Sequence, residues 1–377
     1  MYMTHNKSIY LDNAASTFPK PKIVLKQVFD ILNNNTSNPG RSGHFLSENA
    51  AQKIYDCRHI AADYFGNQDD AVLFTQNATY AVNTLFNGLL KEGDHVVISD
   101  MEHNCVLRPL VALENKGVTF SCFDTDLPPE NMEDYLRPNT KLIFICHASN
   151  VTGHTIDIKT IAQIARQHKI LFGIDASQSA GHIRYNMQQD NIDFICTSGH
   201  KSLFGLQGSG LFITRNDIEF PPLVYGGTGT ESLNPWQPKI LPEYYESGTL
   251  NTPAIVSLGT GIEFVKKHEN EINKKIAVLI TECHNLLSRI DGIRIYSGKN
   301  TEIPIVAFSY KNKHSEYIAE YLNKHKICVR AGYHCSALAH KKLNTTENGL
   351  VRVGMSYFNT LADIEKLCYY LGKLCFY

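Results

Sequence analysis

The chain has 377 residues, of which 43% are hydrophobic and 19% charged, and its formal net charge is −1. This length and balance indicate a globular protein of about two domains, and the near-neutral charge argues against a nucleic-acid or acidic-membrane partner. Because the sequence contains neither a signal-peptide pattern nor an apolar run of about 20 residues, we expect a cytoplasmic protein with reduced cysteines, and the cysteine spacing predicts no metal site.

Between residues 70 and 215, short apolar runs alternate with segments of helical spacing. Helices are predicted over 79–90 and 158–169. Continuous apolar strands that alternate with helices are typical of a mostly parallel sheet covered on both faces, which defines an α/β fold whose ligands bind at the carboxyl ends of the strands. The predicted strands are 72–75, 95–99, 141–148, 170–175, 193–197 and 210–214.

The character of the chain changes after residue 215. Residues 221–238 are rich in Pro, Gly and Thr and predict a long functional loop. A long helix is predicted over 255–290, with a break inside it, followed by strand-like runs at 303–310, 327–332 and 350–354 and a terminal helix at 361–374. We therefore predict a large domain over 25–254 and a smaller α+β domain formed by 1–24 together with 255–377.

Polar residues follow four of the predicted strands, in the segments QNATYA, DMEHN, DASQSAGH and SGHKS. Each of these residues also has a purely structural interpretation. Asp175 is equally consistent with a helix N-cap and with a functional carboxylate. His103 alone is consistent with a hydrogen-bonded core or surface residue, and Lys201 alone with a solvated lysine. Because the carboxyl ends of parallel strands meet at one edge of a sheet, these side chains are expected to converge. Their convergence favours a shared ligand.

Pyridoxal phosphate (PLP) accounts for the whole set. Its aldehyde needs an amine, which Lys201 offers, and its ring nitrogen needs a carboxylate, which Asp175 offers. Gln178 lies three residues after Asp175 and is predicted to bind the phenolate oxygen, while His103 offers a flat face to the ring. The phosphate needs a helix N-terminus and hydrogen-bond donors, for which the candidates are Thr79, Ser198 and His200.

These segments resemble the class V aminotransferase family of fold-type I PLP enzymes over essentially the whole chain, from YLDNAAST (10–17) to RVGMSYFNT (352–360). The resemblance rests on the motifs NPGRSGHFLS, TQNATYAVN, MEHNCVLRP, ASNVTGH, GIDASQSAGH, TSGHKSLFGLQGSG, YESGTLNTPA and RAGYHC. The last motif is similar to that of group II (Suf-type) cysteine desulfurases and selenocysteine lyases. The fold implied is that of a fold-type I PLP-dependent transferase.

The resemblance also implies roles for individual residues. Lys201 is expected to form the Schiff base, Asn150 to lie near the phenolate oxygen and the substrate, and Cys335 to take up sulfur as a persulfide. Thr249 is expected to contact the phosphate from the partner subunit of a homodimer with shared active sites. Ala78 stands in the phosphate segment where a hydroxyl is common. The substrate-binding residues implied are Arg352, for the substrate carboxylate, with Asn150, His44 and Ala14.

The activity implied is conversion of L-cysteine to L-alanine, with a sulfur-acceptor protein as a further partner. A selenocysteine lyase or another class V aminotransferase acting on a small amino acid remains an alternative, as does a PLP-fold scaffold with little turnover. Cys335 separates the desulfurase from other class V reactions, because transamination needs no thiol, and the presence of Lys201, Asp175 and Arg352 argues against a scaffold. A reactive thiolate requires a lowered pKa, and Arg330 and His334 are the neighbours in sequence that are candidates for lowering it.

Overall fold

The computed structural model describes residues 8–40, 42–215, 217–299 and 301–374. Residues 1–7, which belong to the predicted smaller domain and to the N-terminus predicted to lack a signal peptide, lie outside the described residues. So does Arg41 of the NPGRSGHFLS motif. In the part of the chain that is described, no helix combines the length and apolar character needed to cross a membrane.

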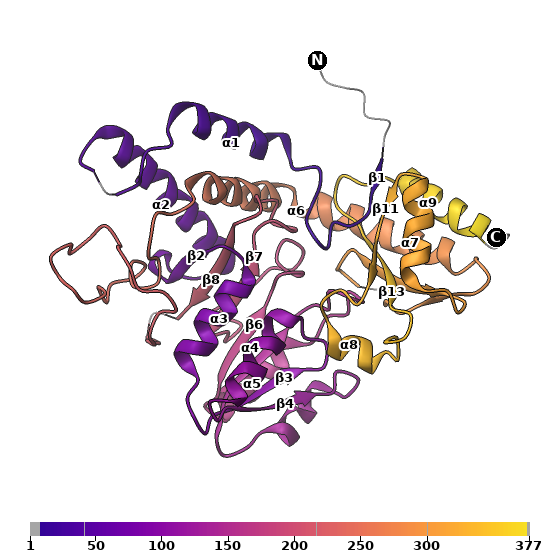
Figure 1. Ribbon diagram of the computed structural model, residues 1–377, viewed down its shortest axis with the longest axis horizontal. Helices are drawn as coiled ribbons and strands as arrows, with labels where there is room; N and C mark the ends of the chain where they lie inside the picture. The colour runs from indigo at the N-terminus through magenta and orange to yellow at the C-terminus, as the bar shows by residue number, and fades with distance from the viewer. Residues whose placement is uncertain (1–7, 41, 216, 300, 375–377) are drawn as a thin grey trace.

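A seven-stranded sheet forms the centre of the larger part of the molecule (Figure 1), in the order β2-β8-β7-β6-β5-β3-β4. The strands from β4 to β7 run parallel, whereas β8 is antiparallel to both β7 and β2. This confirms the mostly parallel α/β sheet. The bounds are β2 (Val72–Thr75), β3 (His95–Ser99), β4 (Thr119–Phe123), β5 (Thr140–Cys146), β6 (Leu171–Asp175), β7 (Phe194–Ser198) and β8 (Gly210–Thr214).

Strand β4 was not predicted, and its burial explains why. It lies at the edge of the sheet and most of its residues are exposed or half-buried. Its sequence TFSCF therefore lacks the continuous apolar run that marks the buried strands. The strands predicted at 72–75, 95–99 and 210–214 begin and end where expected, and the other predicted strands of this sheet shift by a residue or two.

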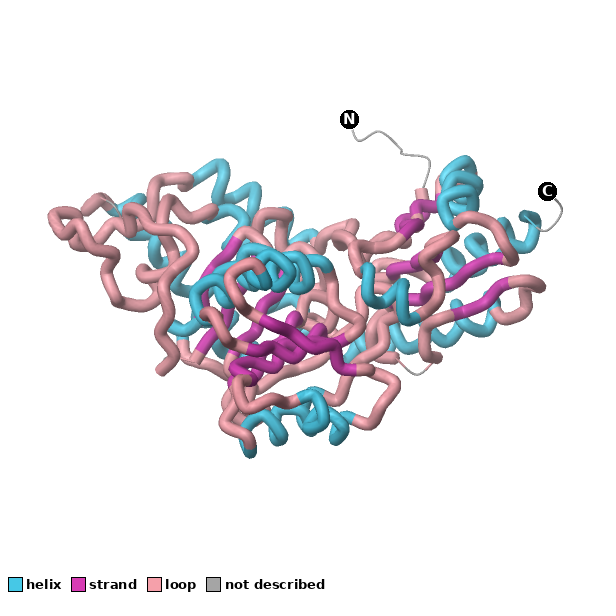
Figure 2. The backbone as a smooth tube through the Cα atoms, turned by 60° about the horizontal axis from the view of Figure 1, so that its bottom comes forward, coloured by secondary structure: helices cyan, strands magenta, loops and turns pink. Residues whose placement is uncertain are grey.

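Helices cover both faces of this sheet (Figure 2). Alternate residues of β5 show the two layers: Ile143 and Ile145 belong to the core formed with α2, α5 and α6, whereas Leu142 and Phe144 belong to the core formed with α3 and α4. The bounds are α1 (Lys22–Asn34), α2 (Phe45–Phe65), α3 (Ala78–Leu89), α4 (Asn104–Glu114), α5 (Ile158–Gln167), α6 (Thr252–Leu287) and the 3-10 helices η1 (Asp69–Ala71) and η2 (Pro129–Tyr135).

Helix α6 is continuous over 36 residues, so the predicted break inside it is wrong. Two glycines in this helix allow close packing. A Cβ atom at Gly259 would lie 2.5 Å from the Cys57 sulfur, and one at Gly261 would lie 2.0 Å from the Leu203 carbonyl oxygen. These glycines let α6 pack directly against α2 and against the turn that follows Lys201.

The C-terminal part carries a four-stranded antiparallel sheet, and β1 near the N-terminus pairs with β11 in a two-stranded one. The predicted run at 327–332 divides into β11 and β12, which belong to different sheets. The division of the chain at residue 254 stays a prediction, because α6 runs across it. The bounds are β1 (Ile9–Tyr10), β9 (Ile293–Ile295), β10 (Ile305–Tyr310), α7 (Ser315–Lys324), β11 (Ile327–Cys328), β12 (Arg330–Gly332), α8 (Ala337–Lys342), β13 (Leu350–Gly354) and α9 (Leu361–Lys373).

Candidate active site

A small pocket lies at the carboxyl ends of β5, β6 and β7, beside the first turns of α3 and α4. It is lined by eight of the residues predicted from the sequence and by four that were not assigned to the site. The predicted ones are Ala78, Thr79, His103, Asn150, Asp175, Gln178, Ser198 and Lys201, and the others are Cys105, Cys146, Ala148 and Ser177.

Asp175 ends β6 and is buried at the floor of this pocket. One carboxylate oxygen accepts a hydrogen bond from the Ser177 backbone NH at 2.8 Å, and the other accepts one from the Cys105 thiol at 3.4 Å. No described helix lies between β6 and β7, so the alternative that Asp175 is only a helix N-cap is wrong. Its carboxylate is held in place by contacts from two separate segments.

His103 is held as a neutral imidazole at the start of α4. Its Nδ1 atom accepts a hydrogen bond from the Cys105 backbone NH at 3.0 Å, which makes it the N-cap of the helix. Burial, with a smaller effect from the Lys201 ammonium, lowers the pKa of His103 to about 4. The ring therefore carries its proton on Nε2 at neutral pH.

Lys201 follows β7 in a turn whose carbonyl groups are held from the N-terminal segment. The Thr17 hydroxyl donates to the Lys201 carbonyl at 2.7 Å, and the Lys20 ammonium donates to the His200 carbonyl at 2.7 Å. Burial lowers the pKa of the Lys201 amine, while the Asp175 carboxylate opposes this shift. A buried amine whose pKa is lowered is more readily available as a neutral nucleophile or base.

The first turn of α3 and the end of β7 form the predicted anion-binding part of the pocket. The Ala78 backbone NH donates to the Ser198 hydroxyl at 3.3 Å, so these two segments lie in direct contact. Thr79 follows on the exposed side of the same turn. The buried Nδ1 atom of His200 has no hydrogen-bond partner among the described residues. Polar groups at a helix N-terminus suit an anionic ligand.

Cys335 lies on what we call the cysteine turn, residues His334–Ser336. Both His334 and Cys335 have left-handed backbone angles, with φ of 51° and 57°, which non-glycine residues seldom adopt. Of the cysteines that the structure describes, Cys335 is exposed and the others are buried or half-buried. An exposed thiol on a strained turn is typical of a functional rather than a packing residue.

Asn150 connects the cysteine turn to the pocket. Its amide nitrogen donates to the His334 carbonyl at 2.7 Å, and its amide oxygen accepts from the Ser336 hydroxyl at 2.6 Å. A second large-domain contact comes from the Asn104 backbone NH, which donates to the Cys335 carbonyl at 2.7 Å. The turn is therefore fixed to the segments that line the pocket rather than to its own sheet alone.

His334 does not supply the positive charge expected of it. Burial and the nearby Arg352 guanidinium lower the pKa of His334 to about 2, and its Nδ1 atom lies 3.3 Å from Nε2 of His340. A histidine that stays neutral throughout the physiological range provides no cationic stabilisation for a neighbouring thiolate. The expectation that His334 lowers the pKa of Cys335 in this way is wrong.

Arg352 projects from β13 and is almost completely buried. Its Nη1 donates to the Asn150 carbonyl at 2.8 Å, and its Nη2 is 3.0 Å from the Asp12 carboxylate. Its Nε has no partner within the described part of the chain. Close by in sequence to Asp12, the Ala14 carbonyl accepts a hydrogen bond from Gln178 at 2.9 Å. The predicted carboxylate-binding residue is thus held next to the pocket with donor capacity remaining.

Six predicted residues do not line this pocket, namely Ala14, His44, His200, Thr249, Cys335 and Arg352. His44 is exposed and caps α2, where its Nδ1 accepts from the Ser47 backbone NH at 3.2 Å. Thr249 is also exposed and lines a separate cleft together with Thr228 and Thr230. The contact of Thr249 with the phosphate of a partner subunit and the substrate role of His44 stay predictions.

The family model described as Aminotransferase class-V matches residues 9–367. The chain belongs to the class-V aminotransferase family. Membership of this family implies a PLP cofactor.

Curated relatives resemble the chain over nearly its full length. A probable cysteine desulfurase of Methanothermobacter thermautotrophicus is 32% identical, with 95% of this chain and 92% of the relative covered. A probable cysteine desulfurase of Pyrococcus abyssi is 30% identical, with 97% and 93% covered. Among solved structures, the apo cysteine desulfurase of Thermococcus onnurineus NA1 superimposes with a TM-score of 0.91 at 28% identity, covering 98% of this chain and 95% of that one.

Proposed function

We propose that this protein is a PLP-dependent cysteine desulfurase that converts L-cysteine to L-alanine and takes up the sulfur as a persulfide on Cys335. The observation that carries the proposal is the link through Asn150, which lines the pocket and binds both ends of the cysteine turn. This link supports a role for the exposed Cys335 thiol beside a pocket that contains the half-buried Lys201 and the buried Asp175. Simple transamination has no use for that thiol.

The residues around the pocket fit PLP. The Ser177 hydroxyl lines the pocket and is buried without a partner among the described residues, as is Nδ1 of the adjacent His200. Unsatisfied buried polar atoms are uncommon in native proteins and suggest a missing partner. When bound, PLP supplies an electron sink for the α-carbon of an amino acid. Lys201 would bind PLP covalently, and Asp175 would pair with its ring nitrogen. Gln178 would contact the phenolate oxygen, and His103 would stack on the ring. The phosphate would be bound by Thr79, Ser198 and His200.

The protein's own residues then provide binding, proton transfer and the nucleophile. Arg352 would bind the substrate carboxylate, a task suited to a planar guanidinium. The Lys201 amine would remove the α-proton and later return a proton. The Cys335 thiolate would attack the substrate sulfur, so that a sulfur–sulfur bond forms as the carbon–sulfur bond breaks. The electron pair of the broken bond remains on carbon, which is protonated to the methyl group of alanine.

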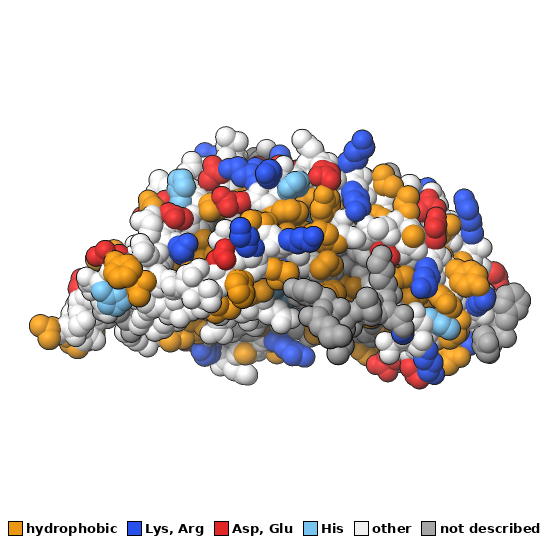
Figure 3. All heavy atoms as spheres, turned by 90° about the horizontal axis from the view of Figure 1, so that it is seen from above, with side chains coloured by type: hydrophobic (Ala, Val, Ile, Leu, Met, Phe, Trp, Pro, Cys, Tyr) orange, Lys and Arg blue, Asp and Glu red, His pale blue; other side chains and the backbone are white. Residues whose placement is uncertain are grey.

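A homodimer with shared active sites is part of the proposal. Thr249 and His44 are exposed and lie outside the pocket of their own chain, and loop 221–243 projects from the body at the left of Figure 1 with Leu233 and Trp236 largely exposed. Phe29 and Leu32 of α1 are also exposed, and Figure 3 shows hydrophobic side chains on one face of the molecule. Exposed apolar surface of this kind is typical of a subunit interface.

The proposal is tested with excess dithiothreitol by assaying alanine and sulfide release from L-cysteine, and alanine and selenide release from L-selenocysteine. Selenium leaves carbon more easily than sulfur and needs less help from a nucleophile. Cys335→Ala should therefore lose alanine formation from cysteine and keep part of the activity on selenocysteine, while Cys328→Ala, at a half-buried cysteine outside the turn, should behave as wild type. If Cys335→Ala releases alanine from cysteine at the wild-type rate, the desulfurase proposal is wrong and only membership of the class V family remains.

A further inference from the structure

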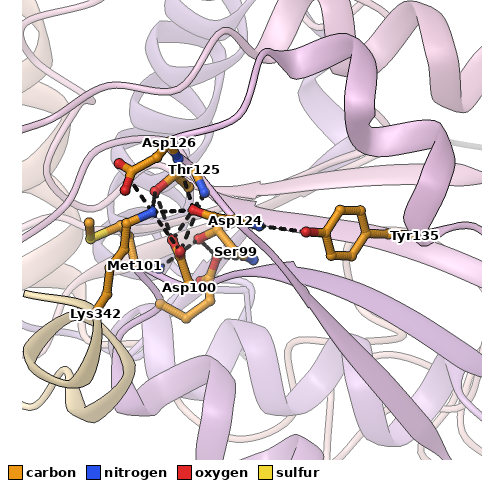
Figure 4. A network of polar contacts seen from close by, with 9 residues as sticks. Ser99, Asp100, Met101, Asp124, Thr125, Asp126, Tyr135 and Lys342 are labelled. Atoms are coloured by element: carbon orange, nitrogen blue, oxygen red, sulfur yellow. Dashed lines mark hydrogen bonds and ion pairs between the residues drawn. The ribbon is translucent and has the colours of Figure 1, made fainter.

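Lys342, the last residue of α8, is surrounded by carboxylates of the large sheet (Figure 4). Its ammonium lies 2.7 Å from Asp100, 2.5 Å from Asp124 and 3.2 Å from Asp126, and it donates to the Thr125 hydroxyl at 3.0 Å. The side chains of Lys342 and Asp100 are only 14% and 16% exposed. We call Lys342 with its three aspartates the lysine clamp.

The lysine clamp joins the segment that contains Cys335 to the large-domain segments that follow β3 and β4. Helix α8 begins two residues after Cys335, so Lys342 lies at the far end of the segment that contains the cysteine turn. Asp100 directly follows β3 and lies three residues before His103, while Asp124 directly follows β4. The same large-domain segment also holds Cys335 itself, through the Asn104 backbone NH. The cysteine segment is thus fixed to the pocket wall at both of its ends.

This arrangement differs from an ordinary surface ion pair. Exposed pairs contribute little to stability because water and salt screen them. Here the ammonium and the Asp100 carboxylate are largely withdrawn from water, whereas Asp124 and Asp126 are 49% and 79% exposed. The single positive charge lies among three carboxylates and reduces the repulsion between them. The cysteine turn that the clamp supports has two consecutive left-handed non-glycine residues, a conformation that persists only when surrounding contacts hold it.

We propose that Lys342 is a positioning residue for sulfur transfer: by binding Asp100, Asp124 and Asp126 it holds the Cys335 turn over the pocket. The inference rests on the proposed function. It predicts that loss of the clamp slows the step that uses Cys335 and spares the steps that use the pocket alone. A purely structural role would impair both.

The test compares Lys342→Met, Lys342→Arg and Lys341→Met in the alanine assay with both substrates, under the same reducing conditions. Lys341 is the exposed neighbour in α8 and serves as the matched control. Lys342→Met should lower kcat on cysteine by at least about fivefold, with KM and the kcat on selenocysteine changed less than about twofold. Lys342→Arg should recover most of the loss, and single-turnover persulfide formation on Cys335 should slow by the same factor as kcat.

Asp124→Asn, which removes one carboxylate and keeps the lysine, provides a second variant if Lys342→Met does not fold. If Asp124→Asn lowers kcat on cysteine and leaves kcat on selenocysteine nearly unchanged, the result supports the inference. Wild-type kcat on cysteine, or an equal loss on both substrates, overturns it. Failure of the proposed function is distinguished by Cys335→Ala: if that variant still turns over cysteine, the desulfurase proposal is wrong, whereas an inactive Cys335→Ala beside an unaffected Lys342→Met contradicts the clamp alone.

Discussion

The pocket floor and the cysteine turn are built in different ways. Asp175 and Ser198 are the last residues of buried strands, and Lys201 follows one, so the hydrogen-bond ladder of the sheet fixes where these side chains lie. The cysteine turn has left-handed backbone angles and depends on contacts from the other part of the molecule, at Asn104 and Asn150. The comparison indicates that cofactor chemistry and sulfur transfer depend on different sets of contacts. Substitutions in the pocket floor should therefore lower turnover of both substrates, whereas substitutions in the cysteine turn should lower turnover of cysteine alone.

The largest effect is expected at the pocket floor. Lys201→Ala should lower turnover of both cysteine and selenocysteine by roughly 10⁴-fold or more, because it removes the amine that binds the cofactor and moves the α-proton. The purified variant should also lack the visible absorbance of the lysine-bound cofactor. Borohydride reduction and peptide mapping of the wild type check the site, and a label on any other lysine would contradict the assignment.

Asp175→Asn should keep the cofactor and lose about 10²- to 10³-fold in kcat on both substrates alike, because a buried charge at the ring nitrogen is removed. Asp193→Asn is the matched control. Asp193 is also buried, but it pairs with Arg215 outside the pocket, so its loss should lower thermal stability and leave kcat unchanged. A PLP-loaded Asp175→Asn variant with near-wild-type kcat would show that the carboxylate has no electronic role.

The cysteine turn should respond to one substrate only. Ser336→Ala removes the 2.6 Å bond to Asn150, and because a single hydrogen bond contributes about 0.5–1.5 kcal/mol, kcat on cysteine should fall roughly two- to tenfold. Activity on selenocysteine should stay close to wild type. Ser288→Ala, at an exposed serine at the end of α6, provides the control. An equal loss on both substrates would break the distinction between the two regions.

Much of the pocket was predictable from the sequence, because its residues directly follow apolar strands. Cys105 was not, since its contact with Asp175 depends on how α4 is oriented above the sheet. The lysine clamp was equally inaccessible: Lys342 and Asp100 are 242 positions apart, and no local pattern relates them. The neutral state of His334 follows from its burial, which the sequence motif RAGYHC does not reveal.

The smallest effect on turnover is expected at Glu102, a buried acid in contact with the pocket-lining Cys146, because its contribution is to stability. Its Oε1 accepts from the Ser99 hydroxyl at 2.5 Å and from the Cys146 backbone NH at 2.7 Å, and burial raises the pKa of Glu102 to about 8. The folded state therefore binds this proton up to about pH 8, whereas the unfolded chain releases it near pH 4.5. This contribution to the free energy of unfolding must fall as pH rises through that window, by at most about 1.4 kcal/mol per pH unit.

Glu102→Gln should remove this pH dependence, because glutamine keeps the acceptor oxygen and does not titrate. Urea unfolding at pH 6, 7 and 8 measures the free energy of unfolding of wild type and variant. Plotted against pH, the two free energies should converge or cross as pH rises. Parallel dependence of both proteins on pH would mean that Glu102 does not hold its proton in the folded state.

The central claim is that Cys335 receives the sulfur of cysteine. It is tested most directly by a single turnover of the PLP-loaded wild type without added thiol, followed by alkylation and peptide mass spectrometry. The account predicts one added sulfur atom on the peptide that contains Cys335, formed in step with one alanine per active site. Alanine formed with no sulfur on that peptide, or with the sulfur on another cysteine, would contradict it.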